Sequence, residues 1–524
     1  MRKFFRFSMI FLALFVSLGL SCTPVSADGP SVTSQGKFGI DGDNLTWTVY
    51  IDGTLIISGK GGMDDWNNPM RAAWYDRGSW VNRVIIEEGV TNIGSYSFSD
   101  YRSLTSVEIA SSVKTIGMCA FSKCNKLENV SIAEGVEDIQ HAAFWYCKAL
   151  EKIELPDSVE TLGSAIFEHC SALKNVKMPN NVNLTEIPAD LFASSGITEI
   201  TLYDGVKTIG EKAFAECRSL ASAVLPETLE TIERSAFTHS GLTEITIPEG
   251  VKTIGYEAFY YCYDLSSLTL SETLETIGAS AFSINKLQEV IIPSSVTKIG
   301  ELAFLSCSSL KKVTLPANSV SFGERVFAGC HALETVVIPE GITSLGWGAF
   351  SGCGLLKDVQ LPESMVEIDA NAFFDCEALT SITIPESVTR IGKYAFYNSV
   401  EEITVLSENA VFEEDVFEYF SPQKSEIKII GYTNSTAEEY AKAYVYSFEA
   451  LPEVTEPVTE PVTEASAEVT TKATDTTPPS DANDGNGSKA TVAVVCIAAA
   501  VLVVAAIIIV LKIKKETEKN KLSH

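Results

Sequence analysis

Phenylalanine recurs along the middle of this chain at a nearly constant interval, usually directly after alanine. We call these residues the marker phenylalanines: Phe98, Phe121, Phe144, Phe167, Phe192, Phe214, Phe237, Phe259, Phe282, Phe304, Phe327, Phe350, Phe373 and Phe396. Successive members are 22–25 residues apart. A fixed period in the twenties is typical of a solenoid, in which each coil contacts mainly its two neighbours. The sequence therefore predicts a rod of about 14 stacked coils.

One period, residues 242–264, reads LTEITIPEGVKTIGYEAFYYCYD. Its first residues are rich in β-branched side chains, which predicts a strand with Ile245 and Ile247 pointing inward and Thr246 outward. Pro248 is expected to end the strand, because proline cannot donate a hydrogen bond to a ladder. Nine periods carry proline in this column.

The second half of the period predicts a bend and a packed far side. Gly255 is expected at the bend, although Gln140, Glu233 and Asp369 replace it in other periods, so a left-handed backbone is not required there. The Ala258–Phe259 pair places a small side chain beside a large one, as layered packing requires.

Different sequences flank the repeats. Within residues 28–80, Asp52–Gly53 separates two alternating runs and predicts a β-hairpin. Four of the six tryptophans precede the first marker phenylalanine, and we expect residues 28–80 to form a β cap over the first coil: Trp47, Trp66, Trp74 and Trp80. Residues 421–451 are expected to close the other end with a strand followed by a short helix, within 427–448.

The pattern LxxIxIPxxVxxIGxxAFxxC over residues 81–420 resembles the BspA-like leucine-rich repeat family of bacterial cell-surface proteins. The flanking segments are similar to those of the same family. The resemblance implies an α/β-type solenoid that is mostly β, a leucine-rich repeat rod with a cap at each end. It also implies adhesion, since relatives bind host matrix proteins such as fibronectin or fibrinogen, or other bacteria.

Residues 1–27 have the pattern of a secretory signal peptide. Basic residues precede an apolar run, and Val25-Ser26-Ala27 offers a cleavage site after Ala27. Cys22 suggests a lipoprotein alternative, but the residues before it make a poor lipobox.

Residues 490–511 carry no charge and would span about 33 Å as a helix, enough to cross the ~30 Å hydrocarbon core. The lysine-rich tail 512–524 is expected to stay in the cytoplasm. A wall-sorting signal is the alternative, but LPEVT at 451–455 lacks the glycine and lies far upstream. Residues 452–488 are rich in Thr, Pro and Glu without aromatics, which predicts a disordered stalk. The chain is thus expected to be a single-pass membrane protein with its N-terminal region outside the cell.

Nine cysteines lie three residues after a marker phenylalanine: Cys124, Cys147, Cys170, Cys217, Cys262, Cys307, Cys330, Cys353 and Cys376. Export makes disulfides one hypothesis. However, Cys217 and Cys262 have cysteine-free coils on both sides, about 10 Å from the next thiol, which exceeds disulfide reach. In most coils that lack this cysteine the following turn is also one residue shorter. We therefore predict a ladder of buried free thiols, and we expect Cys119, which lies in a different column, to be exposed.

Composition and motifs argue against an enzyme. The net charge of −29 disfavours nucleic-acid binding, and only five histidines are present. His169 and His239 share a column but lie three coils apart, about 15 Å, too far to share a metal. We predict no catalytic residues, cofactor or metal site. An enzyme with an active site of unrecognised type is the alternative.

The outward strand positions predict a polar platform for an extracellular protein ligand. The candidate partner-binding residues on it are Glu199, Thr201, Glu244, Thr246, Glu289, Lys311, Lys312 and Thr314. A solvated face without a ligand is the alternative. Tyrosines between Tyr256 and Tyr263, including the candidates Tyr260 and Tyr261, suggest carbohydrate binding as a second hypothesis. Core packing of these rings is equally compatible with the sequence.

Overall fold

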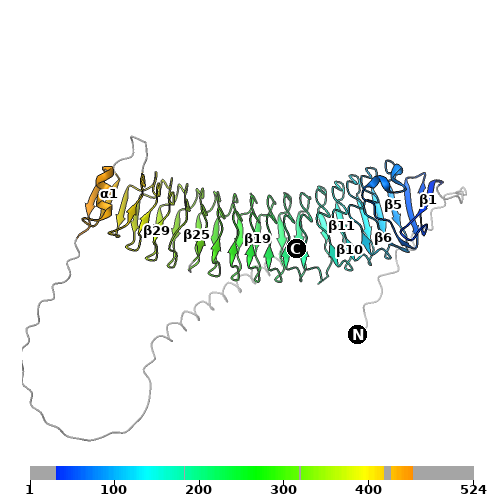
Figure 1. The fold of residues 1–524 in the computed structure, drawn as a ribbon, viewed down its shortest axis with the longest axis horizontal. Helices are drawn as coiled ribbons and strands as arrows, with labels where there is room; N and C mark the ends of the chain where they lie inside the picture. The colour runs from blue at the N-terminus through cyan, green and yellow to red at the C-terminus, as the bar shows by residue number, and fades with distance from the viewer. Residues whose placement is uncertain (1–30, 182, 318–319, 418–426, 453–524) are drawn as a thin grey trace, which may run out of the picture. The chain divides into compact units, whose positions relative to one another are not determined.

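Each period of the sequence forms one coil of a solenoid of about 15 turns. The computed structural model describes residues 31–181, 183–317, 320–417 and 427–452. Figure 1 shows the coils side by side, from β1 (Val32–Phe38) at one end to α1 (Thr436–Tyr444) at the other. The described part is mostly β with this single α-helix, so the coils lack the helices that an α/β label implies.

The first strand of each coil stacks parallel to its neighbours and forms one side of the solenoid, which we call the strand face. Its strands are β3 (Thr54–Gly59), β5 (Arg83–Ile86), β7 (Ser106–Ile109), β9 (Asn129–Ile132), β11 (Lys152–Glu154), β13 (Asn175–Lys177), β15 (Glu199–Thr201), β17 (Ser222–Val224), β19 (Glu244–Thr246), β21 (Ser267–Thr269), β23 (Glu289–Ile291), β25 (Lys312–Thr314), β27 (Thr335–Val337), β28 (Asp358–Gln360), β30 (Ser381–Ile384), β32 (Glu402–Val405), β34 (Lys428–Gly431) and β35 (Ser447–Ala450). The predicted alternation is confirmed in β19, where Ile245 and the following Ile247 are buried and Thr246 is exposed.

A second, shorter strand follows in most coils and forms another parallel row. Its strands are β4 (Gly61–Gly62), β6 (Val90–Ile93), β8 (Thr115–Ile116), β10 (Asp138–Ile139), β12 (Thr161–Leu162), β14 (Glu186–Ile187), β16 (Thr208–Ile209), β18 (Thr231–Ile232), β20 (Thr253–Ile254), β22 (Thr276–Ile277), β24 (Lys298–Ile299), β26 (Ser321–Phe322), β29 (Glu367–Ile368), β31 (Arg390–Ile391) and β33 (Val411–Phe412). The isoleucines of this row, such as Ile254, face the core.

The marker phenylalanines fill the third side of the core as one continuous stack. All fourteen are buried, and neighbouring ring centroids lie 5.0–5.8 Å apart with nearly parallel planes. Trp74 continues the stack at one end, 5.7 Å from Phe98, and Phe417 continues it at the other, 6.0 Å from Phe396. The repeat therefore extends beyond the fourteen predicted coils. The sequence pattern missed the outermost coils because tryptophan replaces phenylalanine at Trp74 and the spacing before Phe417 is shorter.

The residues around each marker phenylalanine form what we call the marker turn, from three residues before the ring to four after it. In every coil the residues two before and two after the ring have positive φ, for example Glu257 (55°) and Tyr261 (56°) beside Phe259. Both donate backbone hydrogen bonds to the next coil, at 2.9 Å each. These inter-coil bonds offset the strain of a left-handed non-glycine residue, about 1–3 kcal/mol.

The predicted bend residue, Gly255, is not itself left-handed. A Cβ atom there would lie 2.7 Å from the carbonyl carbon of Glu233 in the preceding coil. Close approach between coils therefore favours glycine at this position, and the left-handed turn begins two residues later.

The N-terminal end contains the predicted hairpin. β2 (Leu45–Tyr50) pairs antiparallel with β3, and β1 adds to β2. The turn has Gly53 at φ 85°, and the Asp52 carboxylate accepts a hydrogen bond from the Thr54 backbone N–H at 2.9 Å. β3 then pairs in parallel with β5. The hairpin therefore occupies the open edge of the row of first strands on the strand face, which we call the long-strand row.

Two short 3-10 helices, η1 (Pro69–Arg71) and η2 (Tyr75–Arg77), flank Trp74. Trp74 is fully buried and donates a hydrogen bond from its indole N–H to the carbonyl oxygen of Ser97 at 3.0 Å. Trp47, Trp66 and Trp80 are partly buried against the same core.

The C-terminal end has the predicted strand and helix, β34 and α1, and one strand more. Ser435 caps α1 by accepting a hydrogen bond from the backbone N–H of Glu438. Ala437, Tyr440 and Ala441 form its buried side. The additional strand, β35, pairs in parallel with β34. The sequence did not predict it because the segment is short and lies directly after a helix.

Several predicted segments lie outside the described residues: the signal peptide 1–27, the stalk 452–488 apart from its first residue, the membrane span 490–511 and the tail 512–524. Within the described ranges no helix combines the length and apolarity needed to cross a bilayer.

Candidate functional site

The candidate residues of the strand face all lie exposed on one side of the rod. They occupy β15, β19, β23 and β25, apart from Lys311, which directly precedes β25: Glu199, Thr201, Glu244, Thr246, Glu289, Lys311, Lys312 and Thr314. Parallel pairing places equivalent residues of neighbouring coils side by side, so they form columns along the rod. Glu289 and Lys312, for example, are paired in register and form an ion pair of 2.8 Å.

One of these columns carries no charge over ten successive coils. We call it the uncharged strip: Thr201, Val224, Thr246, Thr269, Ile291, Thr314, Val337, Gln360, Thr383 and Thr404. Three of its apolar members are more than half exposed, Val224 at 55%, Ile291 at 59% and Val337 at 60%. Of this strip, the sequence-based prediction included Thr201, Thr246 and Thr314, and it missed the other threonines, the glutamine and the apolar members. Reading the sequence at the repeat interval from Thr201 would have found them.

A row of carboxylates runs along the corner where the first strand of each coil ends. We call it the acidic row: Glu88, Glu134, Asp157, Asp204, Glu227, Glu249, Glu272, Glu340, Glu363, Glu386 and Glu408. All eleven are exposed. Several accept hydrogen bonds from the next coil, as Glu340 does from the backbone N–H of Glu363 at 3.0 Å. Hydrogen bonds from Ser111 lower the pKa of Glu88, so this carboxylate stays ionised at neutral pH.

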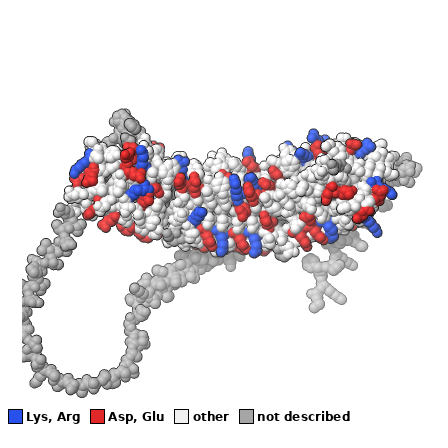
Figure 2. Space-filling model, in the orientation of Figure 1, with Lys and Arg blue, Asp and Glu red and all other residues white. Residues whose placement is uncertain are grey.

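The acidic row and the uncharged strip share the same hollows. Glu227 lines a hollow with Val224 and Thr246, and Glu363 lines another with Val337 and Thr383. Figure 2 shows acidic side chains along the whole visible face, with Lys and Arg among them. The acidic row itself contains no basic residue.

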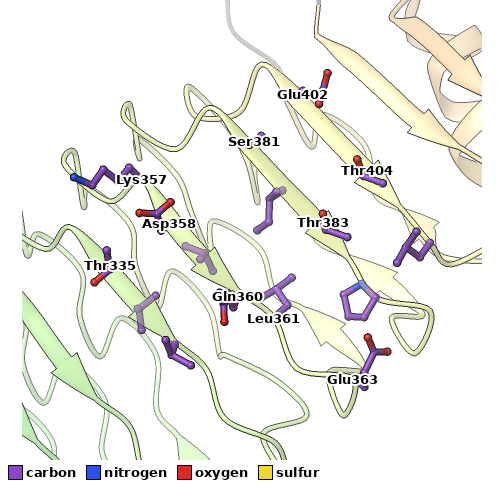
Figure 3. A pocket seen from close by; sticks show the side chains of 16 residues that line it. Thr335, Lys357, Asp358, Gln360, Leu361, Glu363, Ser381, Thr383, Glu402 and Thr404 are labelled. Carbon is purple, nitrogen blue, oxygen red and sulfur yellow. The ribbon is translucent and has the colours of Figure 1, made fainter. Parts of the chain in front are cut away.

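One hollow of the strand face has a volume of about 810 Å³ and lies over β27, β28, β30 and β32 (Figure 3). Smaller hollows of about 330–470 Å³ lie between β9 and β11, across β11, β13 and β15, and between β17 and β19, all on the strand face. Each hollow spans a place where the long-strand row is interrupted. The interruptions before β15, β19 and β23 follow marker turns that are one residue shorter, whereas those before β11 and β30 follow turns of ordinary length.

The candidate tyrosines lie on the marker turn and not on the strand face. Tyr261 is exposed and Tyr260 is half-buried. The ring of His239 stacks on Tyr261 at 4.8 Å, and the Lys286 ammonium lies 4.2 Å from the centre of the Tyr263 ring. The Arg234 guanidinium likewise lies over Tyr256.

The same arrangement recurs elsewhere on the marker turns. Lys148 lies over Tyr146, Arg325 over Trp347 and Lys393 over Tyr394. A sugar ring that stacked on one of these aromatic faces would have to displace the cation, which is worth about 0.5–1 kcal/mol at exposed sites. The geometry therefore gives no specific support to carbohydrate binding by these rings.

The nine cysteines of the ladder are free and buried. Each thiol contacts the carbonyl oxygen of the marker phenylalanine in the preceding coil, at 3.0–3.4 Å. Burial raises the pKa of the Cys217 thiol to about 12. In cysteine-free coils Ser195, Ser240 and Asn285 occupy the same position, and Asn285 bonds the Phe259 carbonyl through its amide.

Cys119 occupies a left-handed position and is half-buried, and burial raises its pKa as well. A raised pKa keeps the thiol protonated and lowers its nucleophilicity. Within the described ranges, His, Cys, Asp and Glu form no group that could hold a metal ion. His169 lies 3.5 Å from Glu168, and His239 lies 3.9 Å from Glu216, so each histidine has its own carboxylate neighbour.

Comparison with known proteins identifies the repeat. The family model described as the BspA type leucine rich repeat region matches six copies, over residues 75–184, 185–311 and 298–423. No curated protein matches the chain significantly.

Solved structures of bacterial leucine-rich repeat proteins are similar to it. One from Bacteroides ovatus is 27% identical with a TM-score of 0.58, and the match covers 78% of this chain and 99% of that one. A leucine rich cell surface protein from Faecalibacterium prausnitzii is 25% identical with a TM-score of 0.32, covering 68% and 95%. The pneumococcal vaccine antigen PcpA is 21% identical with a TM-score of 0.37, covering 71% and 95%.

Proposed function

The chain belongs to the BspA-type leucine-rich repeat family, and we propose that it is a cell-surface binding protein whose strand face holds a basic protein partner. In this proposal it acts as an adhesin or interaction scaffold toward host matrix or other cells. The signal peptide 1–27 directs export, and the span 490–511 anchors the chain in the membrane with its repeats outside.

The uncharged strip is the observation that carries the proposal. Threonine, valine and isoleucine have restricted χ1 rotamers, so a partner that contacts them loses little side-chain entropy. Repetition over ten coils gives a long contact surface without charged groups to desolvate.

The acidic row supports a partner of opposite charge. Its eleven exposed carboxylates flank the strip and are not balanced by basic residues in the same column. Complementary potentials speed association and fix orientation more than they add affinity. We therefore expect binding that weakens as salt screens the charges.

The test combines capture with charge reversal. The repeat region is used to capture ligands from matrix and neighbouring-cell extracts, and the affinity of each captured protein is then measured for two triple variants. Glu199→Lys, Glu244→Lys and Glu289→Lys change the strand face. Glu211→Lys, Glu301→Lys and Glu324→Lys make the same change in charge on exposed marker-turn positions.

The strand-face variant should bind about tenfold or more weakly, because like charges placed opposite one another cost several kcal/mol. The marker-turn variant should bind nearly as the wild type does. Equal losses in both variants, or a partner with an acidic surface, would contradict the proposal.

A further inference from the structure

The strand face between β15 and β25 repeats every two coils rather than every coil. β15 pairs with β17, β19 with β21 and β23 with β25, and the long-strand row is interrupted before the first strand of each pair. Each of these interruptions follows a marker turn that is one residue shorter, after Phe192, Phe237 and Phe282. The structural unit of this part of the face is therefore a pair of coils, 45 residues long.

Exposed carboxylates follow the same two-coil period. Glu199, Glu244 and Glu289 are the first residues of β15, β19 and β23, whereas serine takes this position in β17 and β21. Glu289 is paired with Lys312. Glu199 and Glu244 form no ion pair with any described residue. The five strands of the face from β15 to β23 contain no lysine or arginine, so this column of glutamates lacks a cation except at its end.

The uncharged strip lies between these glutamates and the acidic row, which follows the end of each strand. Its apolar members here, Val224 and Ile291, are more than half exposed. The hollow of about 330 Å³ between β17 and β19 exposes Val224 beside Thr246, with Glu244 and Glu227 also in its lining. An apolar line with carboxylates on both sides fits an amphipathic segment that carries basic residues beside its apolar face.

The spacing of the glutamates limits the conformation of such a segment. Rings of the phenylalanine stack in these coils are 5.0–5.5 Å apart, so two coils span about 10 Å and four coils span about 20 Å. Fourteen residues of α-helix extend about 21 Å, which would place every seventh residue at a glutamate. An extended strand repeats each face about every 6.6 Å and does not match this period. Six residues of polyproline II helix extend about 19 Å and would match it.

The uncharged strip distinguishes the two helical conformations, because it offers one contact residue in every coil. A polyproline II helix repeats each of its faces about every 9 Å, so it would contact the strip only in alternate coils. An amphipathic α-helix presents apolar residues on average every 3.5 residues, about every 5.3 Å. This distance is close to the coil spacing. Only the α-helix therefore matches the strip and the glutamates at the same time.

We propose that the strand face from β15 to β23 binds a basic α-helix of the partner, laid along the rod, with a basic residue at every seventh position. The basic residues face Glu199, Glu244 and Glu289, and the apolar residues contact the uncharged strip, as in recognition of an amphipathic helix by a groove. This site rests on the proposed function, because it is part of the same face. It adds the conformation of the ligand and the spacing of its charges.

The probe is a fluorescein-labelled peptide, AQALAQKAQALAQKAQALAQK, whose binding to the purified full chain is followed by fluorescence anisotropy. Alanine favours the helix, and lysine occupies every seventh position. The control peptide, AQALAQKAKALAQQAQALAQK, has the same composition, but its middle lysine lies on the opposite face of the helix. We expect the control peptide to bind at least fivefold more weakly. Proline in place of the alanine after the central leucine should weaken binding at least tenfold, because it breaks the helix.

A variant of the protein tests the spacing at unchanged net charge. Glu244→Gln combined with Ser222→Glu moves the middle carboxylate by one coil, about 5 Å. This double variant should bind the probe at least fivefold more weakly, whereas Glu211→Gln, on an exposed marker-turn position, should change binding less than twofold. Two further peptides exchange the middle lysine for the alanine three residues later or four residues earlier. One of them should bind the double variant within twofold of the original pair, and which one does so gives the direction of the helix.

Three outcomes would overturn the proposal: equal binding of the probe and the control peptide, full binding of the proline peptide, or no binding of the probe at millimolar concentration. Equal binding of the probe to the wild type and the double variant would also overturn it, because the spacing of the glutamates would then have no role. If the triple Glu→Lys strand-face variant loses the captured partner while the spacing of the peptide lysines has no effect, the proposed function stands and the helix site is refuted.

Discussion

The strand face and the marker turns are two sides of the same coils, and they use the same period in opposite ways. On the strand face, equivalent residues form an uncharged strip with exposed valine and isoleucine side chains. On the marker turns, exposed aromatic rings such as Tyr263 and Tyr256 already have a cation over their faces. The uncharged strip leaves its valine and isoleucine side chains exposed. The marker turns pair their aromatic rings with cations from the same chain.

This difference separates structural from recognition surfaces. The marker turns hold the coils together through the phenylalanine stack, the thiol contacts and the backbone bonds of left-handed residues. Their side chains are consequently constrained by neighbours. The outward residues of the strand face contact mainly the equivalent residues of the adjacent coils. Substitutions there can therefore change which ligand binds without disturbing the fold.

Phe237→Ala should produce the largest loss of stability. It removes a fully buried ring that stacks on Phe214 and Phe259 at 5.0 and 5.1 Å. A buried Phe→Ala change costs about 3–5 kcal/mol. Because a solenoid is stabilised by neighbour contacts, we expect urea denaturation followed by circular dichroism to show an early partial transition. A single transition at the wild-type midpoint would show that the stack does not hold the coils together.

The thiol ladder should make stability fall at alkaline pH. Burial raises the pKa of Cys217 to about 12 in the folded chain, above its ordinary value of 9.0. The thiol's contribution is therefore fully present below pH 9 and is lost between pH 9 and 12, by about 1.4 kcal/mol per pH unit. Denaturation of Cys217→Ala across this range should show a shallower decline than the wild type.

Thiol titration after denaturation gives the control for that experiment. It should find most of the nine ladder cysteines reduced. Quantitative disulfide formation would refute the free-thiol ladder and remove the basis of the alkaline effect.

The pairing of Lys286 with Tyr263 should contribute about 0.5–1 kcal/mol. A double-mutant cycle with Lys286→Met and Tyr263→Leu, measured by urea denaturation, isolates this coupling energy. Lys286 also contacts Asp264 at 3.0 Å, so Asp264→Asn is included as a separate control. A coupling near zero would mean that the ring is free, and it would restore the marker turn as a candidate ligand surface.

Thr246→Ala should have the smallest effect on stability, within about 0.5 kcal/mol, because the side chain is exposed. Thermal unfolding monitored by circular dichroism measures the change. A loss comparable to that of Phe237→Ala would show that the strand face is structural too, and the contrast between the two sides would fail.

Much of the core follows from local pattern. Ile245 and Ile247 alternate with Thr246, and the marker phenylalanines recur once per coil. Stacking the coils buries both sets of side chains. The hairpin at Asp52–Gly53 was also predictable, because its turn chemistry is local. The outermost coils were not, since Trp74 and Phe417 replace the usual dipeptide and spacing.

The candidate site divides in the same way. Periodicity identified the exposed column of Thr201, Thr246 and Thr314. It did not reveal the hollow between β28 and β30, because the marker turn before β30 has the ordinary length and strand pairing is a tertiary property. The sequence left exposure and core packing of the tyrosines equally open, and the cations over Tyr256 and Tyr263 come from other parts of the chain.

The sequence by itself determined the coil length, the inward residues and the position of the thiols, because each depends on a short pattern repeated many times. Only the tertiary structure decided the left-handed residues beside each marker phenylalanine. Residues such as Glu257 and Tyr261 have no intrinsic preference for positive φ, and they adopt it because the next coil accepts their backbone hydrogen bonds. The interruptions of the long-strand row before β11 and β30 were decided at the same level, since the marker turns before them have the ordinary length.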